Sequence, residues 1–127
     1  MDFFDKLRQD YPLMYENAYD LYVGEGWQPI ILALTKQIQS RIDWSVKVGH
    51  PIDQVTVQQI KEKFGGLRFY YEGGDDTIDG TVNMAESWAS HTCEVCGDRA
   101  TKKTNGWIKN VCDKHFDELE QRKKEQL

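Results

Sequence analysis

The side chains of this chain with the clearest chemistry are two pairs of metal-binding residues in its last third. Cys93 and Cys96 lie three positions apart, fifteen residues follow, and Cys112 and His115 repeat the spacing. Thiolate and imidazole are donors that Zn²⁺ prefers, and four of them complete a closed tetrahedral site. The spacing therefore predicts one structural Zn²⁺ ion bound by these four residues.

The local sequence around both pairs suits a shared ion. Gly97 follows the first pair and can adopt the backbone conformation of a tight turn, so that two sulfurs approach one point. A helix over residues 113–121 would place Cys112 and His115 together at its first turn. A glycine-ended turn and a helix start are therefore the two elements expected to hold the ligands.

A short hairpin is predicted between the two pairs. The segment ATKKTNGWIKNV offers Asn105-Gly106 as its turn, followed by the strand-forming residues Trp107, Ile108 and Val111. The glycine-ended turn with its two cysteines, the hairpin and the helix together resemble the treble-clef family of zinc fingers, over about residues 91–120. Members of that family include nucleases, ribosomal proteins, ubiquitin-pathway modules and structural modules, so the resemblance implies a fold and a metal rather than an activity.

A second resemblance covers the whole chain. An "FGGLRFYY" hairpin ahead of a "CE.CG" finger is similar to small uncharacterised proteins of phages and prophages. That resemblance implies an accessory protein in the cytoplasm of a bacterial host, where it would occupy the surface of a host enzyme or defence protein. The acidic character of the chain would suit masking a nucleic-acid-binding site on such a target.

Composition and charge narrow the function classes. The 127 residues carry a formal net charge of −5; residues 1–90 hold 8 Lys and Arg against 14 Asp and Glu, and residues 91–127 hold 8 against 7. An acidic chain is repelled by phosphate backbones, so unspecific nucleic-acid affinity is not expected. No apolar run approaches the length of a membrane span and the N-terminus is unlike a signal peptide, which predicts a cytoplasmic protein without a membrane partner. In a reducing compartment, three cysteines favour metal binding over disulfides.

The histidines outside the two pairs have weaker assignments. His91 lies two residues before Cys93 and is an alternative metal ligand, although His115 has the better helical placement. We expect His91 to support the site or to lie exposed. His50 precedes a proline in a loop and is expected to be solvated.

No catalytic site is expected from the residue inventory. A catalytic zinc keeps one position open for water, whereas the predicted site has four protein ligands. The chain lacks the H-x-E segment of zinc deaminases, and its Gly-Gly pairs lack the lysine and hydroxyl of a nucleotide-binding loop, so no small-molecule substrate is evident. We therefore expect a protein without enzymatic activity, and a treble-clef nuclease or other hydrolase is the alternative.

The first ninety residues predict an α+β core. Residues 2–10 suit a short helix, and residues 24–44 suit a longer one with Pro29 in its first turn. The apolar stripe of the longer helix is formed by Ile31, Leu34, Ile38 and Ile42. The predicted fold is thus α+β: N-terminal helices packed on a β-hairpin, then a helix and a treble-clef-like finger. We divide it into a core over residues 1–90 and a finger over residues 91–127, packed as one unit.

The predicted hairpin runs through VTVQQIKEKFGGLRFYYEGG and turns at Gly65-Gly66, which pairs Phe64 with Leu67. This register puts Ile60, Glu62, Phe64, Leu67, Phe69 and Tyr71 on a core face. Val55 and Val57 then fall on the wrong side, which predicts a bulge near Gln58 and Gln59, or a second covered face. The opposite face carries Lys61, Lys63, Arg68 and Tyr70, with Lys63 opposite Arg68.

A further helix is expected between the hairpin and the cysteines. Asp75, Asp76 or Thr77 would cap it, and Ile78, Val82, Ala85 and Trp88 would form its apolar stripe. Glu86 is expected to face solvent. After His115, the helix continues, with Phe116 and Leu119 packed back on the finger.

Two functions follow from these features. The favoured one is a non-catalytic zinc-binding module that binds a protein partner through exposed aromatic side chains. Trp27 and Trp107 are candidates, although core burial is the first expectation for each. The alternative is nucleic-acid binding through an anion-binding face formed by Lys61, Lys63, Arg68, Tyr70, Lys102 and Lys103.

Overall fold

The structure is a computed structural model that describes residues 1–126. Its helices and strands, in chain order, are α1 (Phe3–Asp10), α2 (Pro12–Tyr15), β1 (Asp20–Leu21), the 3₁₀ helix η1 (Glu25–Trp27), α3 (Gln28–Lys47), β2 (Thr56–Lys63), β3 (Gly66–Glu72), α4 (Asp76–Ser90), β4 (Lys102–Lys103), β5 (Asn110–Val111) and α5 (Asp113–Glu125). Helices combine with a small mixed sheet, and a Cys/His cluster lies near the C-terminus. The predicted α+β class is confirmed.

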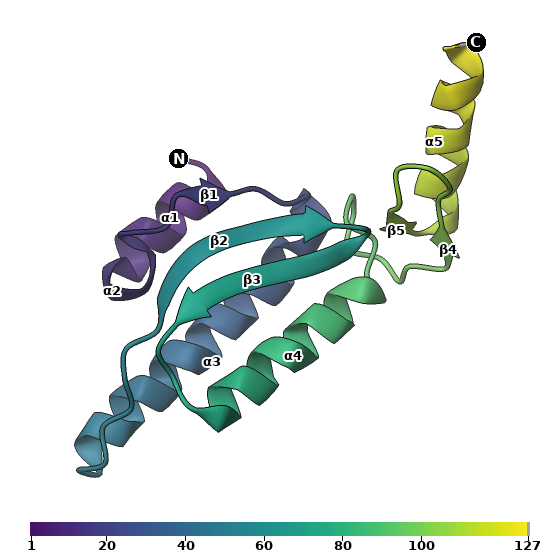
Figure 1. Cartoon of the computed structure of the whole chain (residues 1–127). Coiled ribbons are helices and arrows are strands. Elements are labelled where there is room, and N and C mark those ends of the chain that lie inside the picture. Colours follow the sequence, from purple (N-terminus) through teal and green to yellow (C-terminus); the bar gives the residue numbers. More distant parts are fainter. Residues whose placement is uncertain (127) are drawn as a thin grey trace.

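The main sheet has the strand order β1-β2-β3, with β1 parallel to β2 and β3 antiparallel to it. Helices α3 and α4 lie side by side against this sheet (Figure 1). The second sheet, β4-β5, and helix α5 lie beyond the tip of the β2–β3 hairpin. The hairpin tip therefore faces the part of the chain that contains β4, β5 and α5.

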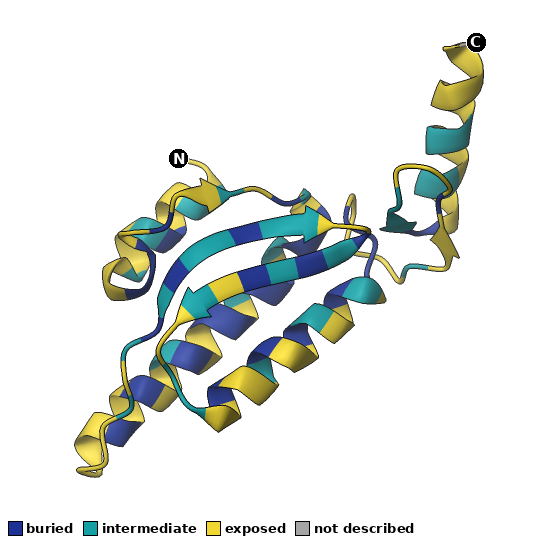
Figure 2. Ribbon diagram, in the orientation of Figure 1, coloured by how far each residue is buried: buried dark blue, intermediate teal, exposed yellow. Residues whose placement is uncertain are grey.

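The long helix α3 follows its predicted pattern. Pro29 lies in the first turn, where its missing N–H costs no helical hydrogen bond. The whole predicted stripe is buried, namely Ile31, Leu34, Ile38 and Ile42. Figure 2 shows that buried and exposed positions alternate along α3. The first helix also forms as predicted, with Leu7 buried and Phe3 and Phe4 packed against the core.

Helix α4 begins as predicted, but the last residue of its buried stripe differs from the prediction. Asp75 caps it, since its Oδ1 accepts a hydrogen bond of 3.0 Å from the Ile78 N–H. Ala89, rather than Trp88, completes the buried stripe, and Trp88 is exposed. Both positions continue a 3.6-residue period from Ala85, so only packing against the core distinguishes them.

Glu86 also departs from its prediction. Its side chain is half-buried and its Oε2 accepts a hydrogen bond of 3.0 Å from the N–H of Phe69 in β3. Since β3 is an edge strand among the described residues, this N–H has no partner strand. Glu86 therefore satisfies the sheet edge instead of facing solvent.

The turn of the β2–β3 hairpin lies one residue earlier than predicted. Lys63 pairs with Gly66, so Phe64 and Gly65 form the turn, with φ angles of 55° and 80°. Two-residue hairpin turns of this kind need positive φ at both positions. Asn110 and Ile108 cover Gly65, where an added Cβ would lie 3.1 Å from Asn110 Nδ2. Contacts from the C-terminal segment thus accompany the observed turn.

The altered register moves Phe64 out of the core. Leu67 pairs with Glu62, so the predicted pairing of Phe64 with Leu67 is wrong, and Phe64 is 69% exposed. Because each β3 residue changes partner by two positions, Ile60, Leu67 and Phe69 keep their inward orientation. The like-charged cross-strand pair is Lys61 with Arg68, not Lys63 with Arg68.

The predicted bulge is confirmed. The register shifts between Val57, which pairs with Tyr71, and Gln59, which pairs with Tyr70. One extra residue in β2 turns Val55 and Val57 to the same buried face as Ile60.

The segment before α3 holds elements that the sequence pattern did not reveal. Helix α2 begins at Pro12, and Tyr15 is fully buried with its hydroxyl 2.6 Å from Thr35 Oγ1. Burial raises the pKa of Tyr15 well above its ordinary value, so the phenol is neutral. Strand β1 then adds to the edge of β2 through only two residues.

Candidate metal centre

The first pair of ligands lies in a tight turn. The Gly97 N–H donates to the Cys93 carbonyl at 2.9 Å, and the Cys93 N–H donates to the Asp98 carbonyl at 2.7 Å. Gly97 has φ of 86°, as predicted for the residue that ends the turn. This backbone brings Cys96 back toward Cys93.

The second pair lies at the start of α5. Strand β5 ends at Val111, and Cys112 is the N-cap residue of the helix. The Phe116 N–H donates to the Cys112 carbonyl at 2.9 Å, which closes the first helical turn. His115 therefore lies on the same side of the helix as Cys112. Phe116 and Leu119 pack against the buried Cys93 and Cys112, as predicted.

The structure brings the four donors together. One donor atom from each of Cys93, Cys96, Cys112 and His115 lies within 4.8 Å of all the others. His115 Nδ1 is 3.2 Å from Cys112 Sγ and 3.6 Å from Cys93 Sγ, and Cys96 Sγ is 3.8 Å from Cys112 Sγ. Tetrahedral Zn²⁺ with its ordinary bond lengths separates two sulfurs by about 3.8 Å and a sulfur from a nitrogen by about 3.5 Å. The donor set therefore fits one tetrahedral ion.

The ring of His115 is oriented by a second contact. Nδ1 faces the sulfurs, whereas Nε2 lies 3.7 Å from Glu118 Oε2, one helical turn further on. A carboxylate near the remote nitrogen of a metal-binding histidine favours the tautomer that leaves the other nitrogen free to coordinate. Glu118 thus supports coordination through Nδ1.

The thiols differ in their ease of ionisation. Burial opposes ionisation of Cys93, but hydrogen bonds from the backbone of Cys112, Cys96 and Val95 outweigh it and lower the pKa of this thiol. At Cys96, a hydrogen bond from the backbone of Asp98 lowers the pKa, whereas burial and the other two thiols raise it to about 11. Clustered thiolates repel one another, and a bound cation would offset this repulsion.

The Cys93–Gly97 turn and the residue before it, Thr92, contact the segment from Gly24 to Trp27 directly. The Gly26 N–H donates to the Glu94 carbonyl at 2.8 Å, and the Gly24 N–H donates to Glu94 Oε2 at 2.9 Å. Trp27 is fully buried, as first expected, and its Nε1–H donates to the Thr92 carbonyl at 3.0 Å. These three hydrogen bonds join residues about seventy positions apart.

Both glycines of this segment are required by the close approach. A Cβ on Gly26 would lie 2.1 Å from the Cys93 carbonyl oxygen, and one on Gly24 would lie 2.4 Å from the Glu94 carbonyl oxygen. The sequence pattern GEGW indicated only the start of a helix, and this role was missed. The available signal was a pair of glycines immediately before a tryptophan.

Charged and polar contacts also join the C-terminal segment to the hairpin tip. Lys109 Nζ lies 3.1 Å from Glu94 Oε1 and 3.7 Å from Glu62 Oε1. Asn110 Nδ2 donates to the Gly65 carbonyl at 2.9 Å. The same segment that carries the ligands is thus fastened to both the GEGW segment and the β2–β3 turn.

The loop between β4 and β5 is longer than predicted. Lys103 pairs with Asn110, and the Thr104 N–H donates to the Lys109 carbonyl at 3.0 Å, so the loop contains residues 105–108. A hairpin is present, but Trp107 lies in its loop rather than in a strand. Trp107 is 77% exposed, which corrects the expectation that it belongs to the core.

The residues of the predicted anion-binding face lie on two separate sheets. Lys61, Lys63, Arg68 and Tyr70 are on β2 and β3, and Lys102 and Lys103 form β4. Lys61 Nζ is 3.8 Å from an Asp20 carboxylate oxygen, and Lys102 Nζ is 3.9 Å from one of Asp113. These acids reduce the local positive charge, and nucleic-acid binding by these six residues stays a prediction. His91 is exposed and is not part of the donor cluster found within residues 1–126.

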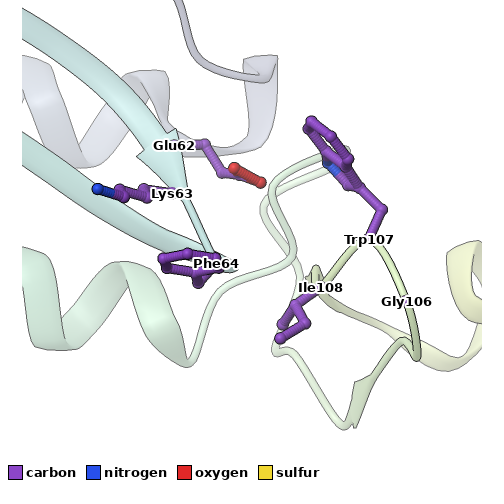
Figure 3. Close-up of a pocket in the computed structure, with 6 residues that line it drawn as sticks. All are labelled: Glu62, Lys63, Phe64, Gly106, Trp107 and Ile108. Atoms are coloured by element: carbon purple, nitrogen blue, oxygen red, sulfur yellow. The ribbon is translucent and has the colours of Figure 1, made fainter.

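An apolar cleft lies between the hairpin tip and the β4–β5 loop. It has a volume of about 210 Å³ and is lined by Glu62, Lys63, Phe64, Gly106, Trp107 and Ile108. Figure 3 shows that the lining comes from two segments far apart in the chain. Neither sequence pattern indicated this cleft, because it depends on how the segments meet.

Comparisons of the chain with protein-family models, with curated proteins and with solved structures gave no match. Among residues 1–126, no helix has the length and apolar character needed to cross a membrane. The geometry of the donor cluster and of the surface around it is therefore the basis for a functional conclusion.

Proposed function

We propose that this chain is a non-catalytic protein-binding module whose C-terminal third is organised by one structural Zn²⁺. The convergence of Cys93, Cys96, Cys112 and His115, at separations suited to a tetrahedral ion, is the observation that carries the proposal. Three thiolates and one imidazole are a common structural zinc set. Together with the β4–β5 hairpin and α5, these ligands resemble the treble-clef arrangement.

A structural role for the ion follows from what surrounds it. Four protein donors complete a tetrahedron and leave no coordination position for water or substrate. In addition, the Cys93–Gly97 turn accepts a backbone hydrogen bond from Gly26 at Glu94, and Thr92, just before the turn, accepts one from the Trp27 indole. Metal binding would therefore hold the β4–β5 loop in place against the hairpin tip.

Protein binding is supported by the two large aromatic side chains at that contact. Trp107 and Phe64 are 77% and 69% exposed and line one cleft. Exposed aromatic side chains that line one cleft are typical anchors of protein interfaces and are costly to leave in water. From the phage resemblance, we propose a host enzyme or defence protein as the class of partner.

The metal part of the proposal is tested on purified untagged protein. Elemental analysis should find one zinc per chain, and a cobalt-substituted sample should show the absorption of a four-coordinate thiolate site without bound water. No bound metal, or a water ligand in the cobalt spectrum, would contradict a closed structural site.

The binding part is tested by affinity capture from a nuclease-treated bacterial host lysate. The wild-type chain should retain a stoichiometric protein, and Trp107→Ala should lose it. Trp44→Ala is a matched control, because Trp44 is also exposed but lies on α3, away from the cleft. Recovery of nucleic acid alone from an untreated lysate would favour the nucleic-acid alternative, which charge reversal at Lys61, Lys63 and Arg68 should then abolish.

A further inference from the structure

The cleft between the hairpin tip and the β4–β5 loop is the size of one side chain. Its volume is about 210 Å³, whereas pockets for drug-sized ligands measure about 300–1,000 Å³. Phe64, Trp107 and Ile108 provide apolar walls, and the charged residues in the lining are Glu62 and Lys63. The cleft is therefore suited to a single residue of a partner rather than to a small molecule.

The two charged residues of the lining are oriented differently. In Figure 3, the Glu62 carboxylate points toward Trp107, whereas the ammonium of Lys63 points away from the loop. Lys63 Nζ instead lies 5.6 Å from the centre of the Phe64 ring. The Glu62 carboxylate thus determines the charge that a group entering beside Trp107 would meet.

Glu62 is incompletely satisfied within residues 1–126. Its Oε1 is buried and has no hydrogen-bond partner among them, and the side chain as a whole is 12% exposed. The nearest cation, Lys109 Nζ, is 3.7 Å from Glu62 but 3.1 Å from Glu94, so two carboxylates share one ammonium. Lys109 therefore offsets only part of the negative charge of Glu62, and a second cation at the exposed part of this side chain would offset more of it.

We propose that this cleft binds an arginine side chain presented by the partner protein. A guanidinium is planar, so it stacks on the exposed face of an indole while its N–H groups point at a carboxylate. Trp107 supplies the indole and Glu62 supplies the carboxylate. This inference rests on the proposed protein-binding function and names the chemistry of the partner.

Other occupants fit the charge less well. An acidic side chain would be repelled by Glu62, and an apolar one would remove the remaining water from a carboxylate that already lacks a hydrogen bond among the described residues. A lysine ammonium is compact and strongly hydrated, so it gains less from stacking on Trp107 than a guanidinium does.

The test follows the indole Nε1–H resonance of Trp107 in zinc-loaded, ¹⁵N-labelled protein. The Trp107→Phe variant assigns this signal among the four tryptophans. The probe is the blocked tripeptide acetyl-Leu-Arg-Leu-amide, and its comparison is the same peptide with neutral citrulline in place of arginine. We expect a saturable shift with arginine and at least tenfold weaker binding with citrulline.

Two variants separate the Glu62 contact from general charge effects. Glu62→Gln should reduce affinity for the arginine peptide to that of the citrulline peptide, while zinc content and the other indole signals stay unchanged. Glu72→Gln, at an exposed carboxylate near the far end of the hairpin, should bind like the wild type.

Several outcomes would overturn the proposal. These are an unshifted Trp107 signal at millimolar peptide, equal binding of the arginine and citrulline peptides, equal binding of a third peptide with lysine in place of arginine, or equal loss of affinity in both glutamine variants. If Trp107-dependent capture of a protein persists in any of these cases, the arginine assignment fails and the protein-binding function stands. If the peptide binds as expected but no protein is captured, the arginine site stands and the module function fails.

Discussion

Replacing Gly26 with alanine should separate the metal-binding turn from the core. The new Cβ would lie 2.1 Å from the Cys93 carbonyl oxygen, 2.5 Å from the Gly97 nitrogen and 2.7 Å from the Glu94 carbonyl oxygen. All three are backbone atoms of the turn itself, so no side-chain rotation relieves the overlap. The turn must therefore move as a whole.

The size of the effect follows from that overlap. Inserting a methyl group into a well-packed site typically costs about 1–3 kcal/mol, and rigid backbone neighbours place Gly26→Ala near the upper end. Moving the turn also weakens the hydrogen bond from the Gly26 N–H to the Glu94 carbonyl, which contributes about 1 kcal/mol. We expect the free energy of unfolding of the zinc-loaded protein to fall by about 3 kcal/mol.

The assay is urea unfolding of the zinc-loaded protein, followed by tryptophan fluorescence because Trp27 lies beside the substituted position. Gly80→Ala is the matched control: Gly80 lies in α4 and a Cβ there would meet no atom of the described residues within 4 Å. Alanine has the higher helix propensity, so the control should gain up to about 1 kcal/mol. If Gly26→Ala unfolds at the same urea concentration as Gly80→Ala, the described contact between the turn and the core is wrong.

Three further changes test the ligand set, the core contact and an ion pair. Cys112→Ser should lower zinc affinity by more than 100-fold, since loss of a residue that only supports a metal ligand already lowers affinity by about 10–100-fold. A chelator titration measures the affinity, and unchanged zinc binding would exclude Cys112 as a ligand. Trp27→Phe removes a buried hydrogen-bond donor and should lower the free energy of unfolding by about 1–3 kcal/mol, whereas Trp44→Phe, at an exposed position, should change it little. Hydrogen bonding to Arg41 lowers the pKa of Asp75 below its unfolded value, so this contribution is present above the unfolded pKa and is lost as pH falls through the folded pKa. Asp75→Asn should consequently lose less stability than the wild type between neutral and acidic pH, and identical acid dependence in urea unfolding would contradict this.

Local patterns predicted the elements whose residues interact within a few positions of one another. The apolar spacing of α3, the Asp75 cap, the bulge in β2 and the Gly97 turn all depend on neighbouring residues. The metal donors belong to the same group, because each pair is separated by only two residues and sits on one turn. A short window of sequence therefore contains the interactions that produce each of these features.

Predictions failed where two residues or two turn positions fitted the local sequence pattern almost equally well. Trp88 and Ala89 both continue the stripe of α4, and the turn of the hairpin fits Phe64-Gly65 as well as Gly65-Gly66 in its alternation. The choice between them was made by packing, which no short window of sequence contains. The same reason explains why Glu86 was assigned to solvent instead of to the edge of β3.

By itself, the sequence determined the ligand types, their spacing and the α+β class of this protein. Only the tertiary structure decided that Gly24 and Gly26 contact the Cys93–Gly97 turn, and that exposed Trp107 and Phe64 line one cleft together with Glu62. The physical reason is sequence separation: residues about seventy or forty positions apart meet through packing and long-range hydrogen bonds. Neither such packing nor such hydrogen bonds produce a periodic pattern along the sequence.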